Sequence, residues 1–105
     1  MKIYIEDEAI SDILEMGLTR KNKYRDMTPA AVRKLQNIVK IMRLSDSPEE
    51  LMKYPSLGYE RLLGKRKGQE SVRCDRRWRL IFTSNRNNDT TTIYINLIEL
   101  SRHYE

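Results

Sequence analysis

The segment YERLLGKRKGQESVRCDRRWRLIF, residues 59–82, predicts most of a basic β-sheet. Between Glu60 and Arg79, eight Lys and Arg residues stand against three Asp and Glu, so these twenty residues carry a charge equal to the net +5 of the whole chain. The basic residues alternate with apolar ones at strand spacing, which places the charge on a sheet rather than in a tail. Such a surface favours a polyanion as its partner.

Three strands are expected in this segment. The first covers residues 59–63 and the second residues 70–74, while Trp78, Leu80 and Phe82 give the third strand an apolar face. Because Trp78 shares the parity of Leu80 and Phe82, we expect its ring in the core rather than on a surface that stacks with bases.

The hairpin between the second and third strands has two possible registers. Arg79 points away from the core, and it shares a face with Arg73 only if Cys74 pairs with Trp78 around a three-residue loop. A two-residue turn would put the two arginines on opposite faces of the sheet. Cys74 itself is expected to be a small packing residue.

Strand and helix signals precede the basic segment. Residues 2–5 alternate as a short strand, and an apolar stripe over residues 7–17 predicts a first helix. Thr28, followed by proline, starts a second helix whose apolar face repeats through Met42. A capping-box pattern at residues 47–50 opens a short helical turn.

After the basic segment, residues 84–89 are expected to form a polar turn. Residues 91–100 are apolar on both parities, which predicts a central strand covered on both faces. The element order is β-α-α-β-β-β-β, and the fold class is α+β: the N-terminal strand and a helical hairpin pack on one face of a curved, antiparallel-rich sheet. At 105 residues with 39% hydrophobic content, we expect a single domain spanning residues 1–105.

The sequence offers few groups for metal or redox chemistry. Cys74 is the only cysteine and His103 the only histidine, so we expect no internal disulfide, no metal site and no cofactor. Met1 opens a charged strand rather than a signal peptide, and no apolar run approaches the roughly 20 residues that a membrane span needs. The expected location is the cytoplasm, without a membrane partner.

Several motifs occur in the order found in a known family. They are Gly17 with basic residues after it, the loop from Gly64 to Gly68, the Ser-x-Arg of Ser71 and Arg73, the W-R-L-I-F strand and a terminal His-Tyr. Over essentially the whole chain they resemble the HigB, or plasmid maintenance killer, branch of the RelE/ParE toxin superfamily. The resemblance implies a RelE-like fold and a toxin of a type II toxin-antitoxin system.

The resemblance also implies a set of site residues. Glu60 falls at the position of a general base, Arg79 at that of a phosphate-stabilising arginine, and His103 and Tyr104 at that of a pair for acid catalysis and positioning. Two positions differ from the family pattern: Leu63 stands where many relatives have Lys, and the HigB branch typically ends in Asp-Tyr-His. Contacts with the RNA backbone are expected from the basic residues Arg61, Lys65, Arg66, Lys67, Arg73 and Arg77.

The chemistry can be argued from the residues as well. Metal-free RNA cleavage needs a base for the 2′-hydroxyl, an acid for the departing 5′-oxygen and fixed positive charge for the phosphate. Glu60, His103 and Arg79 supply one of each. The products would be a 2′,3′-cyclic phosphate and a 5′-hydroxyl. The sequence therefore favours a metal-independent endoribonuclease over two alternatives: a ParE-like inhibitor that docks on a protein such as gyrase, and an RNA-binding module without catalysis.

The resemblance implies partners too. Nuclease members of the superfamily cleave messenger RNA on the ribosome and are neutralised by a cognate antitoxin, which in the HigB branch is a HigA-like helix-turn-helix DNA-binding protein. The stretch from Leu18 to Arg43 contains eight basic residues against one acidic residue. We expect this stretch to face either the antitoxin or ribosomal RNA.

Overall fold

The structure, a computed structural model, describes residues 1–17, 22–86 and 91–102 of the chain. Its sheet has five strands in the order β1-β5-β4-β3-β2, in which β1 runs parallel to β5 and the other neighbours are antiparallel. The predicted α+β class and element order are confirmed. The elements are β1 (Lys2–Ile5), α1 (Glu8–Met16), α2 (Pro29–Leu44), β2 (Glu60–Arg61), β3 (Glu70–Arg73), β4 (Trp78–Arg86) and β5 (Ile93–Arg102), with short 3₁₀ turns between them.

Both helices begin where the sequence predicts, and α1 also ends there. The Asp7 side chain accepts a hydrogen bond from the amide of Ala9 at 2.9 Å, and Gly17 closes α1 in the left-handed conformation at φ 75°. Thr28 caps α2 in the same way, ahead of a proline in the first turn. The predicted capping box of Ser47 and Glu50 is present at the start of a 3₁₀ turn.

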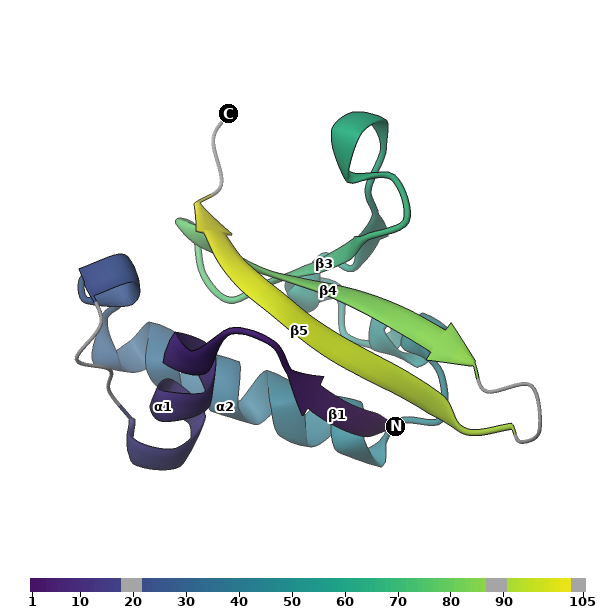
Figure 1. Cartoon of the computed structure of the whole chain (residues 1–105), viewed down its shortest axis with the longest axis horizontal. Coiled ribbons are helices and arrows are strands. Elements are labelled where there is room, and N and C mark those ends of the chain that lie inside the picture. The colour runs from purple at the N-terminus through teal and green to yellow at the C-terminus, as the bar shows by residue number, and fades with distance from the viewer. Residues whose placement is uncertain (18–21, 87–90, 103–105) are drawn as a thin grey trace.

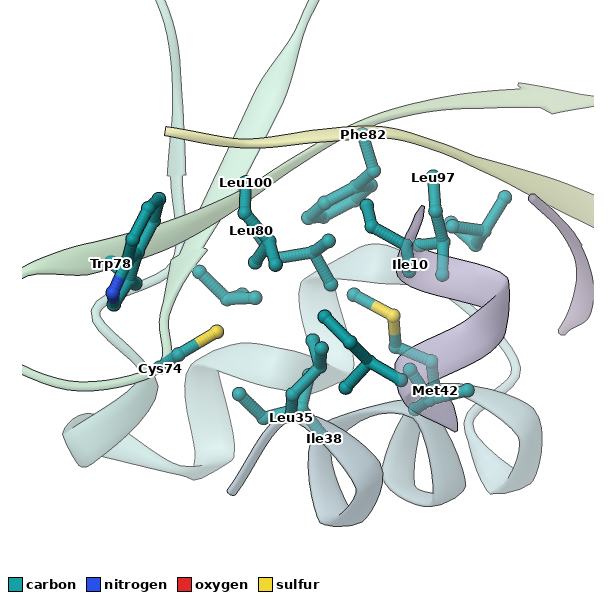
Figure 2. Close-up of a cluster of buried hydrophobic side chains, with 14 of the residues drawn as sticks. Ile10, Leu35, Ile38, Met42, Cys74, Trp78, Leu80, Phe82, Leu97 and Leu100 are labelled. Carbon is teal, nitrogen blue, oxygen red and sulfur yellow. The ribbon is translucent and has the colours of Figure 1, made fainter. Parts of the chain in front are cut away.

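The hydrophobic core lies between the helices and one face of the sheet. Figure 1 shows α1 and α2 together beneath the sheet, and Figure 2 shows side chains from α2 facing those of β4 and β5. Trp78 is 3% exposed and belongs to this core, with Cys74 beside it, as predicted. The opposite face of the sheet, which we call the open face, is therefore left to the residues of the other parity.

A β-bulge explains why β5 is apolar on both parities. Ile81 pairs with Glu99, but the next residue, Phe82, pairs with Leu97, so the register shifts by one within β5. The shift turns both Leu97 and Leu100 into the core, although they differ in parity. The strand is central, as expected, but the prediction that both of its faces are covered was wrong: Tyr94 and its neighbours of that parity are only half-buried.

Two strand boundaries also differ from the prediction. β4 continues to Arg86, and Ser84 pairs with Ile95 inside the ladder instead of opening a polar turn. Polar residues can extend a strand when its partner supplies the hydrogen bonds and the apolar contacts. β2 contains only Glu60 and Arg61 instead of residues 59–63, because the chain leaves the sheet after Arg61 and forms a 3₁₀ turn at Gly64–Arg66.

Tyr24 ties the helical layer to the sheet. Its hydroxyl donates to Asp7 Oδ2 at 2.5 Å and accepts from the backbone amide of Leu100 at 3.0 Å. Its ring meets Trp78 edge-on, with 5.6 Å between ring centroids. One buried side chain thus joins the start of α1 to the end of β5.

Candidate active site

The hairpin between β3 and β4 has the three-residue loop that the shared-face register requires. The amide of Cys74 donates to the carbonyl of Trp78 at 2.9 Å, and Arg73 and Arg79 are directly opposite each other. Asp75 stabilises the loop because its Oδ1 accepts from the amides of Arg77 and Trp78, each at 2.8 Å. Of the two registers that the sequence left open, the structure has the one that places both arginines on the open face.

Glu60 and Arg79 meet on this face. Nη1 of Arg79 lies 2.8 Å from Oε1 of Glu60 and 2.9 Å from Oγ of Ser71. Glu60 and Ser71 are paired across β2 and β3, so three neighbouring strands converge on one guanidinium. The arginine side chain is 13% exposed and the glutamate side chain 54% exposed. The cation is therefore held in place while the carboxylate remains open to solvent.

The loop between β2 and β3 reaches over the open face. Nη2 of Arg66 contacts Oε1 of Glu99 on β5 at 2.5 Å, and its Nη1 donates to the side-chain oxygen of Gln69 at 2.8 Å. Ile81, which is paired with Ser71 and Glu99, is only 2% exposed although it lies outside the core cluster under the sheet. The loop between β2 and β3 therefore covers part of the open face through the contact of Arg66 with Glu99.

Not all of the other predicted RNA contacts lie on the open face. Arg73 is exposed on the open face, and its guanidinium carbon lies 3.8 Å from where a side chain on Gly58 would begin. Arg77 is exposed in the hairpin loop, and Lys65 is exposed in the loop after β2. Arg61 points to the other face of the sheet, where it pairs with Glu49 at 2.5 Å. The remaining predicted contact, Lys67, is also exposed.

His103 and Tyr104 lie outside the described residues. The last described residues of β5 are next to the site, because Ser101 pairs with Arg79. Arg102 lies 5.0 Å from the centre of the Trp78 ring and forms an ion pair with Asp26. These two contacts hold the end of β5 beside the Glu60–Arg79 pair.

Three residues at or near the site were missed as functional residues by the sequence reasoning. Ser71 is fully buried and orients Arg79, Glu99 holds Arg66, and Glu70 is a buried carboxylate on the other side of the sheet. Ser71 could have been found from its parity, because it lies two residues before Arg73 on the same strand face. The other two depend on contacts between distant segments.

Burial strongly perturbs two ionisable groups in this part of the sheet. Burial in the core raises the pKa of the Cys74 thiol to about 12, with a smaller contribution from the charge of Asp75. Burial and a hydrogen bond to Glu70 raise the pKa of Tyr59 to about 12. Both groups therefore stay protonated at neutral pH, so Cys74 is a packing residue and Tyr59 a hydrogen-bond donor.

Residues 1–17, 22–86 and 91–102 contain no cluster of three or more His, Cys, Asp or Glu side chains able to hold a metal ion. Among the helices in these same ranges, none has the length and apolar character needed to cross a membrane.

Several solved structures share this fold. A YoeB/ParE toxin from Agrobacterium tumefaciens matches with a TM-score of 0.58 and 16% identity, covering 99% of this chain and 100% of that one. YafQ from E. coli strain BL21(DE3) matches with a TM-score of 0.59 and 14% identity, and the match covers 97% of this chain and 92% of YafQ. YoeB in a YoeB-YefM complex from Staphylococcus aureus matches with a TM-score of 0.52 and 17% identity, and the match covers 99% of this chain and 98% of that one. Among curated proteins, none matches the chain significantly.

The chain thus shares the fold of these toxin structures, in which a helical pair lies under a five-stranded sheet. A profile of the HigB-like toxin family, described as the RelE-like toxin of the type II toxin-antitoxin system HigB, matches residues 8–97. The chain belongs to this family and is a toxin of a type II toxin-antitoxin system.

Proposed function

We propose that this toxin is a metal-independent endoribonuclease that cleaves messenger RNA on the translating ribosome. The contact of Arg79 with Glu60 and Ser71 at 2.8 and 2.9 Å supports this proposal most directly. It combines a preorganised cation with an accessible carboxylate, and these are two of the three groups that metal-free phosphodiester cleavage needs.

In the proposed reaction, the scissile phosphate binds to Arg79 and displaces the carboxylate of Glu60 from it. Glu60 can move aside because its side chain is more than half exposed and comes from a two-residue edge strand. The freed carboxylate takes the proton of the 2′-hydroxyl, whose oxygen attacks the adjacent phosphorus. Arg79 stabilises the negative charge that builds on the phosphate oxygens.

The third group is an acid for the departing 5′-oxygen. We assign this role to His103, with Tyr104 positioning the substrate, because β5 ends beside Arg79. An imidazole with an ordinary pKa near 6.5 can be held charged by a neighbouring phosphate. The bond from phosphorus to the 5′-oxygen breaks, which leaves a 2′,3′-cyclic phosphate and a 5′-hydroxyl.

The surrounding basic side chains would bind the RNA backbone. Arg73 lies opposite Arg79 on the same face, and Lys65 and Arg77 are exposed in the loops after β2 and β3. Arg66 can exchange its contact with Glu99 for one with a phosphate. These contacts position the strand without specifying its sequence.

The proposed regulator is a cognate antitoxin, of the HigA-like helix-turn-helix type. The family profile is that of a toxin from such a two-protein system, and the S. aureus YoeB of similar fold was solved in complex with YefM. The exposed basic residues of α2, such as Arg33, Lys40 and Arg43, offer one surface for an acidic antitoxin segment or for ribosomal RNA.

The proposal is tested by expressing the toxin and variants of it in a bacterium. Wild-type protein should arrest growth and leave new transcript ends within coding regions. Glu60→Gln, Arg79→Ala and His103→Ala should each lose both effects, whereas the exposed control Arg76→Ala should keep them. Full arrest by Arg79→Ala and His103→Ala, with DNA breaks but no new transcript ends, would support a gyrase inhibitor instead.

A further inference from the structure

A buried carboxylate lies on the side of β3 opposite the Glu60–Arg79 pair. Glu70 precedes Ser71, so its side chain points to the other face of the sheet, and it is 7% exposed. Its two oxygens accept hydrogen bonds from the hydroxyls of Tyr59 at 2.6 Å and Ser84 at 2.5 Å. The burial and the two hydroxyl hydrogen bonds fix the carboxylate in one position.

Among the described residues, no cation forms an ion pair with Glu70. The side chains that hydrogen-bond to it are the hydroxyls of Tyr59 and Ser84, and its cross-strand neighbour Arg61 is paired with Glu49. A neutral side chain could satisfy much of the same arrangement. A buried carboxylate that lines a cavity is therefore a candidate for ligand recognition.

Glu70 lines a cavity of about 390 Å³ at the edge of the sheet. This volume is within the range of small-molecule sites, about 300–1,000 Å³. Leu62 and Leu63 supply apolar walls, while Arg61 and Lys67 add positive charge. The leucine side chains can pack against a flat aromatic ring, and the Glu70 carboxylate can accept hydrogen bonds from N–H groups on the edge of that ring. The two cations can bind a phosphate group of the same ligand.

We propose that this cavity binds a base of the RNA substrate, with guanine preferred. Each oxygen of Glu70 accepts one hydroxyl hydrogen bond and has a second lone pair to offer. Guanine presents two adjacent N–H donors, on N1 and N2, whereas adenine and cytosine present one amino group beside a ring acceptor. Uracil presents a single N–H between two carbonyl oxygens, which the carboxylate repels. The expected order of affinity is guanine first and uracil last.

This inference rests on the proposed RNA substrate. The cavity lies across the two-residue edge strand β2 from the catalytic pair, because Glu60 and Arg61 are consecutive and point to opposite faces. An RNA strand leaving Arg79 over this edge would bring a neighbouring nucleotide, rather than the scissile one, to Glu70. The site would therefore determine which base is accepted beside the cleavage point.

Binding can be measured without cleavage, using the four nucleoside 5′-monophosphates and the methyl NMR signals of Leu62 and Leu63. Guanosine monophosphate should shift these signals at the lowest concentration. Glu70→Gln should weaken its binding about tenfold or more, since hydrogen bonds to a charged group are replaced by weaker ones. The matched control Glu15→Gln, on the exposed side of α1, should leave binding unchanged.

A second measurement uses the wild-type protein alone and does not depend on the folding of a variant. Inosine monophosphate lacks the N2 amino group, so it should bind several-fold more weakly than guanosine monophosphate. The proposal would be overturned if all four nucleotides bound with equal affinity, or if inosine monophosphate bound as tightly as guanosine monophosphate. It would also be overturned if Glu70→Gln protein bound guanosine monophosphate as tightly as wild-type protein. These outcomes are independent of the nuclease test, because loss of cleavage in Arg79→Ala leaves the cavity intact.

Discussion

Replacing Arg79 by lysine tests the catalytic pair most sharply, because it preserves the charge and removes the geometry. The Nη1 atom of Arg79 reaches both Glu60 and Ser71, so the side chain is aimed at one point of the open face. A lysine ammonium is a point charge on a flexible stem and cannot reproduce the planar fork. Loss of one preorganised donor from a developing anion typically costs about 3–4 kcal/mol, or 10²–10³ in rate.

The same substitution should leave the protein folded. The Glu60 side chain is 54% exposed, but the Arg79 side chain is only 13% exposed and also bonds buried Ser71, so we expect the free energy of unfolding to fall by about 0.5–1.5 kcal/mol. The assay compares the cleavage rate of a translated messenger RNA, followed by primer extension, with thermal unfolding of the same preparations. Arg79→Lys should lose at least a hundredfold in cleavage rate while remaining folded at the assay temperature, and Arg76→Ala should match wild type. A cleavage rate within a few-fold of wild type, or one that falls only in proportion to the folded fraction, would refute the role of Arg79.

Three further predictions concern the core and its titratable groups. Tyr24→Phe removes the acceptor for the amide of Leu100 and should lower the free energy of unfolding, measured by urea titration, by about 1–3 kcal/mol. The control Tyr54→Phe, at an exposed site, should change this free energy little. Equal effects of the two substitutions would contradict the role of the Tyr24 hydroxyl. Burial raises the pKa of Asp7, but hydrogen bonds, led by that from Tyr24, outweigh burial and lower it overall. The stabilisation is therefore present above about pH 4 and is lost as the pH falls through the lower, folded-state pKa, so the stability gap to Asp7→Asn should narrow in that window. Cys74, with its pKa raised to about 12 by burial, should resist a thiol reagent at pH 8 until the protein is unfolded; rapid native labelling would show that the thiol is accessible.

The place of Trp78 could be predicted because strand parity is a local property. Once Trp78, Leu80 and Phe82 face the core, Arg79 must face away from it. Its alignment with Arg73 depends on the length of the intervening loop, which the sequence left open between two and three residues. The starts of both helices and the end of α1 could also be predicted, since capping residues act on backbone groups within a few positions.

Contacts between distant segments were beyond this kind of reasoning. The position of Glu60 beside Ser71 depends on the path of the loop from residue 62 to 69, which GKRKG leaves open. The pairing of Arg66 with Glu99 joins residues 33 positions apart, and the bulge at Phe82 is set by packing rather than by pattern. The family resemblance supplied Glu60 as a site residue, and only the fold shows what it contacts.

The chemistry of the cleaved ends tests the central claim most directly. A messenger RNA would be cleaved by the toxin on ribosomes, and its ends compared with those from an RNA carrying a single 2′-deoxynucleotide just before the scissile bond. Cleavage by Glu60, Arg79 and His103 predicts a 2′,3′-cyclic phosphate and a 5′-hydroxyl on the normal RNA, and no cleavage at the modified bond. Cleavage that persists at the deoxynucleotide, or that leaves a 5′-phosphate and a 3′-hydroxyl, would contradict it.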